Sequence, residues 1–140
     1  MKVHVTSQLQ AQLLAVSLHA QSLLIQKFIE WKNGPEDGHY WFSQNKLGDD
    51  GRLFHVHLIP NNEPEARQLW DQLWRRPPVR PWRRRSDRYL LYADGKRHGY
   101  LLIALLEDPG AHDLWLPENK KFLQNFVIVA DNFEFNGSIP

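Results

Sequence analysis

The sequence contains no cysteine, a single methionine and no long apolar run. Without cysteine the chain can form no disulfide, thiol nucleophile or cysteine-ligated zinc site, which fits a reducing compartment. No apolar stretch approaches the ~18 residues that a membrane span requires, and the N-terminal MKVHVTSQLQ lacks the apolar core of a signal peptide. We therefore expect a cytoplasmic protein that makes no contact with membranes.

Common cofactor and hydrolase motifs are also missing. The sequence has no G-x-G-x-x-G, no Walker loop, no G-x-S-x-G and no zinc motif, so we expect no cofactor. Its 140 residues suffice for one domain, spanning 1–140, that buries about two thirds of the surface of the unfolded chain. Hydrophobic residues make up 42% and charged residues 24%, which is ordinary for a globular protein.

The net charge of +1 conceals a strong asymmetry. Residues 75–88 hold seven arginines and one aspartate, whereas the rest of the chain holds ten basic and fifteen acidic residues. Residues 77–82, PPVRPW, can form neither a helix interior nor a central strand, so we expect this segment to be extended and exposed. Guanidinium groups bind phosphates and tryptophan can stack on a base, which predicts RNA binding. The candidate RNA-binding residues of the segment are Arg75, Arg76, Arg80, Trp82, Arg83, Arg84, Arg85 and Arg88. The alternatives are a solvated loop and a contact with an acidic protein.

Two apolar runs, 89–93 and 100–106, flank the glycine-bearing connection 94–99 and predict an antiparallel hairpin. In the second run the odd-numbered and the even-numbered positions are all apolar, so both faces of this strand are apolar. We therefore expect an inner strand that is covered on both faces. Further strands are predicted over 2–6 and 52–60, and helices over 8–32 with a break near 17–20, over 63–76, and from 117 onward. Residues 127–129 could equally form a strand, and 36–51 is predicted to be a polar connection. The order predicts an α+β fold: a small antiparallel sheet with N-terminal helices and a C-terminal helix packed on it, mainly on one face.

Two histidines, His55 and His57, project from the same side of the strand predicted at 52–60. Imidazoles suit acid–base chemistry because their unperturbed pKa lies near neutrality. The alternative is that both are simply polar residues on a solvent-facing strand.

His112 follows the turn formed by Pro109 and Gly110, just past the end of the inner strand. It is either a third candidate for chemistry or an ordinary loop histidine. A metal site made of His55, His57 and His112 is a further alternative. Lys120 and Lys121 are unfavourably placed at the start of a helix, which suggests a use for their charge and makes them RNA-binding candidates.

Four phrases, taken together, resemble the YafO family of bacterial type II toxins, which are ribosome-dependent mRNA endoribonucleases. They are WKNG (31–34), HVHLIPNN (55–62), SDRYLLYADG (86–95) and YLLIALLEDPGAH (100–112), in the order of the family. The resemblance implies a RelE/ParE-like fold and, as partners, a cognate antitoxin, the ribosome and mRNA. It also makes His55, His57, Tyr92 and His112 catalytic candidates. Residues 63–85 depart from the resemblance, because they are longer and richer in arginine than the family pattern leads us to expect.

From these features we expect a toxin that cleaves RNA without a metal. A base would remove the proton of a ribose 2′-OH, an acid would protonate the leaving 5′ oxygen, and cations would stabilise the phosphorane. The alternatives are a non-enzymatic toxin that docks on its target, as ParE-like gyrase poisons do, and a plain RNA-binding module.

Overall fold

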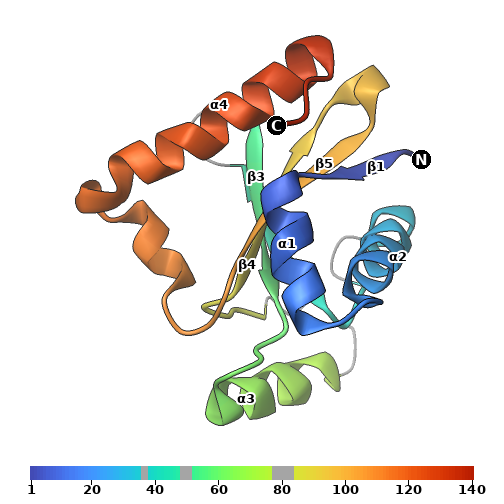
Figure 1. Cartoon of the computed structure of the whole chain (residues 1–140). Helices are drawn as coiled ribbons and strands as arrows, with labels where there is room; N and C mark the ends of the chain where they lie inside the picture. Colours follow the sequence, from blue (N-terminus) through green and yellow to red (C-terminus); the bar gives the residue numbers. More distant parts are fainter. Residues whose placement is uncertain (36–37, 48–51, 77–83) are drawn as a thin grey trace.

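The computed structural model describes residues 1–35, 38–47, 52–76 and 84–140, with the backbone alone for 44–47 (Figure 1). Arg80, Trp82, Arg83 and the extended segment predicted at 77–82 lie outside the described residues. The elements are β1 (Val3–Val5), α1 (Ser7–Val16), α2 (Ala20–Asn33), β2 (Phe42–Leu47), β3 (Leu53–Leu58), α3 (Pro64–Trp74), β4 (Tyr89–Asp94), η1 (Lys96–His98), β5 (Tyr100–Leu106), η2 (Ala111–Trp115), η3 (Pro117–Asn119) and α4 (Lys120–Asn136).

Five strands form one sheet in the order β1-β5-β4-β3-β2. The predicted hairpin is confirmed: β4 and β5 are antiparallel, and Tyr89 pairs with Leu106. The pairs β3–β4 and β2–β3 are antiparallel too, but β1 runs parallel to β5. The prediction of a wholly antiparallel sheet is therefore wrong at this edge. In this parallel pair the N–H of Tyr100 donates to the Lys2 carbonyl at 2.9 Å, and the N–H of Thr6 donates to the Leu102 carbonyl at 3.1 Å.

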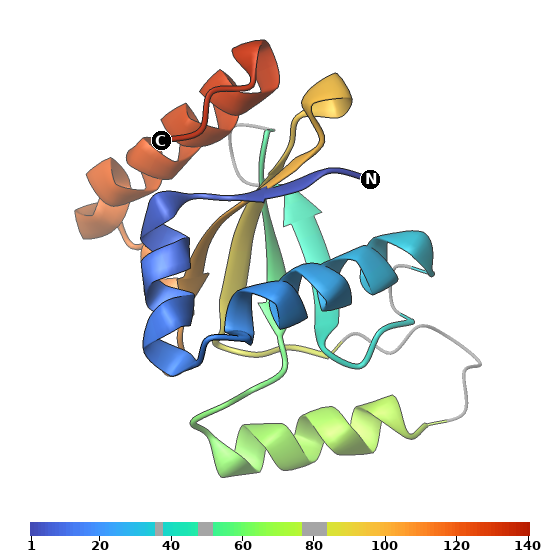
Figure 2. The same ribbon diagram turned by 45° about the vertical axis from the view of Figure 1, so that its right-hand side comes forward.

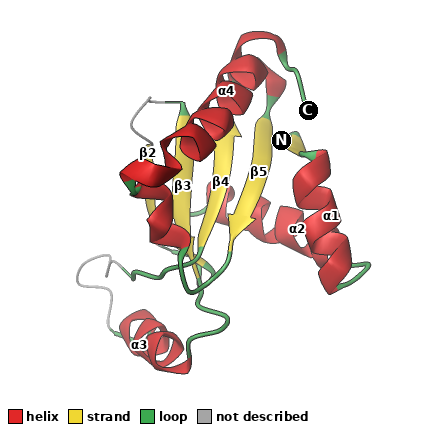
Figure 3. Ribbon diagram, turned by 60° about the vertical axis from the view of Figure 1, so that its left-hand side comes forward, coloured by secondary structure: helices red, strands yellow, loops and turns green. Residues whose placement is uncertain are grey.

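The α+β class is confirmed, but the helices cover both faces of the sheet instead of mainly one (Figure 3). On one face α1 and α2 pack Leu9, Leu13 and Phe28 against the sheet. On the other face α4 packs Phe126 and Phe133 against it. Strand β5 contributes to both layers, as its uniformly apolar sequence predicts.

Strand β2 was not predicted, because its sequence FSQNKL reads as a polar connection. Phe42 at its start is buried and pairs with Leu58 of β3, and the next residue, Ser43, pairs with His57. An edge strand needs few apolar anchors, because it buries little beyond its backbone pairing.

The predicted break between the N-terminal helices is confirmed, since α1 ends at Val16 and α2 begins at Ala20. Thr6 caps α1 by accepting from the N–H of Leu9 at 3.2 Å, and its own hydroxyl donates to the Ile103 carbonyl at 2.7 Å. The C-terminal segment is a helix, and not the alternative strand at 127–129. None of the helices in the described part of the chain is long and apolar enough to cross a membrane.

Helix α3 lies beyond one end of the sheet, apart from the two helical layers (Figure 2). Its buried Trp70 donates from Nε1 to the Tyr40 carbonyl at 2.8 Å. This contact fixes α3 next to the segment that leads into β2.

Candidate active site

The segment Arg84–Arg88, which leads into β4, lies between the end of β3 and the loop after β5. The N–H of Ser86 donates to Nδ1 of His57 at 2.9 Å, and the N–H of Leu58 donates to the Arg88 carbonyl at 2.8 Å. Because Nδ1 accepts a hydrogen bond, the neutral His57 ring carries its proton on Nε2. His57 is half-buried, so part of this residue is accessible to solvent.

Asp87 connects the same segment to the loop that follows β5. Its Oδ1 lies 2.6 Å from Nδ1 of His112 and accepts from the backbone N–H of His112 at 2.8 Å, while Oδ2 accepts from the N–H of Gly110. The Asp87 carbonyl accepts from the N–H of Ala111 at 3.2 Å. One aspartate therefore fixes both the loop and the imidazole that the loop carries.

The electrostatics of this pair favour its charged form. The hydrogen bond and the negative charge of Asp87 raise the pKa of His112, although its side chain is 65% exposed. Partial burial acts to raise the pKa of Asp87, but the N–H groups of His112 and Gly110 and the imidazole outweigh it, so the pKa is lowered. An aspartate–histidine pair with an exposed imidazole, whose Nε2 lies 3.7 Å from Oδ1 of Asp113, resembles the orienting arrangement of acid–base catalysts.

His55 shares a face with His57, as predicted, and their ring centroids are 5.8 Å apart. It is not solvent-facing, however, because only 8% of the residue is exposed. Its ring lies 5.0 Å from the ring of Tyr89 and 4.9 Å from that of Trp115. Trp115 belongs to η2, which the sequence did not predict and which covers this part of the strand. His55 is therefore part of a buried aromatic cluster next to the site and does not reach solvent as a catalytic group would.

Tyr92 lies on the other side of the sheet from the histidines. It is fully buried in the layer beneath α1 and α2, where its ring stacks on Phe54 at 5.2 Å. Its hydroxyl accepts from Nζ of Lys32 at 3.0 Å. The structure thus does not bring Tyr92 together with His57 and His112, and the expectation of a shared catalytic site is wrong for this residue.

The expectation that the arginines are exposed is wrong for Arg84, of which only 1% is accessible. Its guanidinium donates to the carbonyls of Tyr40, His39 and Phe42 at 2.7, 2.8 and 3.0 Å. It also lies over the rings of Trp70 and Trp74, at 4.6 and 4.9 Å. Arg84 therefore joins α3 to the segment before β2 and is not a phosphate ligand.

Arg88 is also engaged within the protein. Its Nε lies 2.9 Å from Oε2 of Glu107, and its Nη1 donates to the Ile59 carbonyl at 3.0 Å. A carboxylate already neutralises this guanidinium, so Arg88 is a poor candidate for binding RNA. The remaining RNA-binding candidates among the described residues are exposed: Arg75, Arg76, Arg85, Lys120 and Lys121.

The sequence reasoning missed Asp87 and Tyr89 as parts of the site. Asp87 is the single acidic residue among seven arginines at 75–88, and that contrast was the available signal. Tyr89 is covered by the same aromatic cluster as His55, and burial raises the pKa of its phenol, against a hydrogen bond from Trp115. No group of three or more possible metal ligands occurs within the described residues, so His55, His57 and His112 do not form the alternative metal site.

Together, fold and site define a small α+β protein with an oriented, exposed imidazole and surface cations nearby in the chain. A family model described as "Toxin YafO, type II toxin-antitoxin system" matches residues 36–135. The chain belongs to this family of toxins, which implies an antitoxin as its partner. Comparison with curated proteins and with solved structures found no match. The fold is compatible with the RelE/ParE-like architecture that the resemblance implies.

Proposed function

We propose that this toxin is an endoribonuclease that cleaves mRNA on the translating ribosome, in the cytoplasm, without a metal. The observation that carries the proposal is the pairing of Asp87 with the exposed His112, together with the hydrogen bond from the preceding residue, Ser86, to the half-buried His57. One short segment thus links a proton donor to a hydrogen-bond donor. Both are needed to expel an alkoxide from a phosphodiester.

In this mechanism the 2′ oxygen attacks the adjacent phosphorus, and the bond from phosphorus to the 5′ oxygen breaks. His112 protonates the leaving 5′ oxygen from Nε2, because its raised pKa keeps the imidazolium populated near neutral pH. The Nε2–H of His57 and the guanidinium of Arg85 stabilise the charge that develops on the phosphate. We assign the acceptor of the 2′-OH proton to a group of the ribosome, since Nδ1 of His57 already accepts from Ser86.

Because the ribosome supplies the base, the toxin alone should have little activity on free RNA. Exposed cations of the toxin would hold the RNA backbone. Lys120 and Lys121 begin α4, a few residues after His112, and Arg85 precedes Ser86 directly. Each of them can contact phosphates without breaking an interaction of the core.

The test is to map the 5′ ends of cellular transcripts after induction of the toxin without its antitoxin. We expect new ends within translated regions, and their loss in His112→Gln. His19→Gln is the matched control, because His19 is also an exposed histidine but lies in the turn between α1 and α2. Intact mRNA together with DNA damage would instead identify a gyrase-poison-like toxin. Salt-dependent RNA binding without growth arrest would identify an RNA-binding module.

A further inference from the structure

The turn between α1 and α2 exposes an unusual amount of apolar surface. Val16, Leu18 and Leu23 are 78, 83 and 43% exposed. Residues 3–26 contain no aspartate, glutamate, lysine or arginine. A large exposed apolar surface that is free of charge is typical of a docking site for another protein, since water solvates it poorly.

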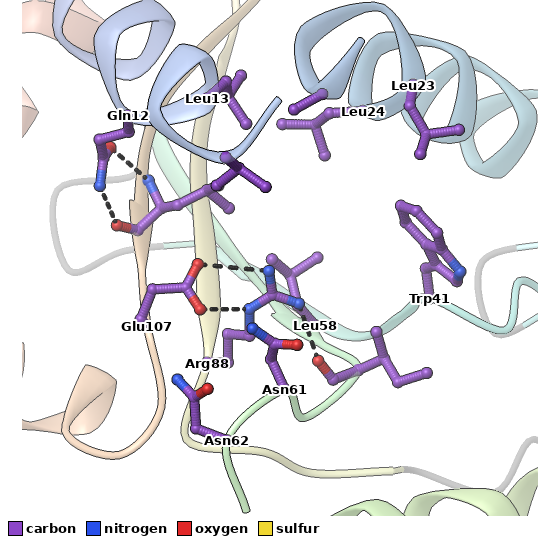
Figure 4. Close-up of a pocket in the computed structure, with 14 residues that line it drawn as sticks. Gln12, Leu13, Leu23, Leu24, Trp41, Leu58, Asn61, Asn62, Arg88 and Glu107 are labelled. Carbon is purple, nitrogen blue, oxygen red and sulfur yellow. Dashed lines mark hydrogen bonds and ion pairs between the residues drawn. The ribbon is translucent and has the colours of Figure 1, made fainter. Parts of the chain in front are cut away.

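A cavity of about 500 Å³ opens beside this turn, between the two helices and the sheet (Figure 4). Leu13, Val16, Leu23, Leu24 and Trp41 form much of its apolar wall. The volume lies within the range of about 300–1,000 Å³ that is usual for binding pockets.

Several polar groups at the rim of the cavity already have partners within the chain. The side chain of Gln12 makes two hydrogen bonds to the backbone of Leu105, at 3.1 and 3.4 Å. Arg88 is bound to Glu107 (Figure 4). Asp108 accepts from the N–H of Asn62 at 2.8 Å. Because these groups are already engaged, an occupant gains most by inserting apolar side chains.

Family membership indicates what occupies the cavity. The cavity lies beneath α1 and α2, on the face of the sheet opposite to His57. A toxin of a type II system has a protein partner in its antitoxin. An uncharged apolar surface around a cavity suits the apolar side chains of such a partner.

We propose that the cavity and the α1–α2 turn together bind the apolar face of an amphipathic segment of the cognate antitoxin. Leucine- or isoleucine-type side chains enter the cavity, and uncharged contacts extend over Val16 and Leu18. Helices α1 and α2 lie outside residues 36–135, which the family model matches, so they can select the toxin's own antitoxin. The inference rests on membership in the toxin–antitoxin family and is independent of the proposed cleavage of RNA.

The test measures the affinity of the purified full-length toxin for the antitoxin encoded beside it. Val16→Lys and Leu23→Glu place a charge at the mouth of the cavity, and each charge suits the dipole of its helix end. We expect each variant to bind the antitoxin about tenfold more weakly or worse. Ile128→Glu is the matched control, because Ile128 is 48% exposed on α4, which covers the opposite face, and its affinity should not change.

Circular dichroism and melting confirm that the variants are folded, and growth arrest without antitoxin confirms that they remain toxic. Unchanged affinity of both variants overturns the proposal. So does a toxin dimer, seen in sedimentation without antitoxin, that Val16→Lys dissociates, because the surface would then join two copies of this chain. A toxin that binds its antitoxin through this surface but leaves mRNA intact supports the inference and refutes the ribonuclease.

Discussion

Asp87 and His112, 25 residues apart in the sequence, meet with 2.6 Å between Oδ1 and Nδ1. The aspartate also binds the backbone of the same histidine and of Gly110, so it fixes the loop and the ring together. Because the imidazole is otherwise exposed, its protonation depends on this one carboxylate more than on burial.

The first prediction is that Asp87→Asn lowers the pKa of His112 toward its ordinary value of 6.5. A neutral amide removes the charge that favours the imidazolium. If His112 is the acid, the lower pKa in Asp87→Asn also slows RNA cleavage at neutral pH. In the wild type the cleavage rate should fall as pH rises through the pKa of His112. NMR titration of the ring measures the pKa. Asp113→Asn is the control and should cause a smaller decrease, since Asp113 Oδ1 lies 3.7 Å from Nε2 of His112. An unchanged pKa in Asp87→Asn would refute the coupling.

The same pair predicts how stability depends on pH. The raised pKa of His112 gives stability that is fully present below 6.5 and is lost as pH rises through the folded-state pKa. The lowered pKa of Asp87 gives stability that is fully present above 3.8 and is lost as pH falls through the folded-state pKa. The melting temperature of the wild type should therefore exceed that of His112→Gln most between these two pH values. A difference that grows above neutral pH would contradict this assignment.

His55 and His57 should respond differently to truncation. His55→Ala removes a buried ring from contact with Tyr89 and Trp115, so we expect a loss of about 2 kcal/mol in the free energy of unfolding. His57→Ala removes a half-buried ring and should cost less than about 1 kcal/mol while abolishing toxicity. Denaturant unfolding and growth after induction separate the two effects. Full toxicity of a folded His57→Ala would exclude His57 from the mechanism.

The hairpin, the two N-terminal helices and the C-terminal helix could be predicted from sequence, because period and turn residues are local properties. The parallel pairing of β1 with β5 could not, since it joins residues nearly one hundred positions apart. Alternation placed His55 and His57 on one face correctly. It could not reveal that Trp115 would cover one of them and leave the other half-buried.

The exposure of the arginines at 84–88 could not be predicted from local sequence either. A run of arginines beside prolines reads as solvent-exposed, but alternation along an extended chain directs Arg84 inward and Arg85 outward. The guanidinium of Arg84 donates to three carbonyls more than forty residues earlier in the chain and lies over two tryptophans of α3. No local pattern in the sequence predicts a buried binding site for a guanidinium.

Substitutions of the neighbouring residues Arg84 and Arg85 should therefore have different effects: the first should lower stability, and the second should weaken RNA binding. Arg84→Gln cannot reach the three carbonyls or cover Trp70 and Trp74, so buried acceptors lose their donors, and we expect a loss of about 3 kcal/mol in the free energy of unfolding. Arg85→Gln changes an exposed charge and should alter that free energy by less than about 0.5 kcal/mol. Denaturant unfolding of the two variants, side by side, tests this difference.

For binding, Arg85→Gln should weaken the affinity for ribosomes or RNA and reduce the slope of log affinity against log salt by about one, as for a lost phosphate contact. Arg84→Gln, measured where it is still folded, should leave that slope unchanged, because a buried guanidinium binds no phosphate. Lys120→Gln extends the test to the start of α4 and should behave as Arg85→Gln does. If Arg85→Gln left both affinity and slope unchanged but weakened antitoxin binding, this charge would belong to the antitoxin interface.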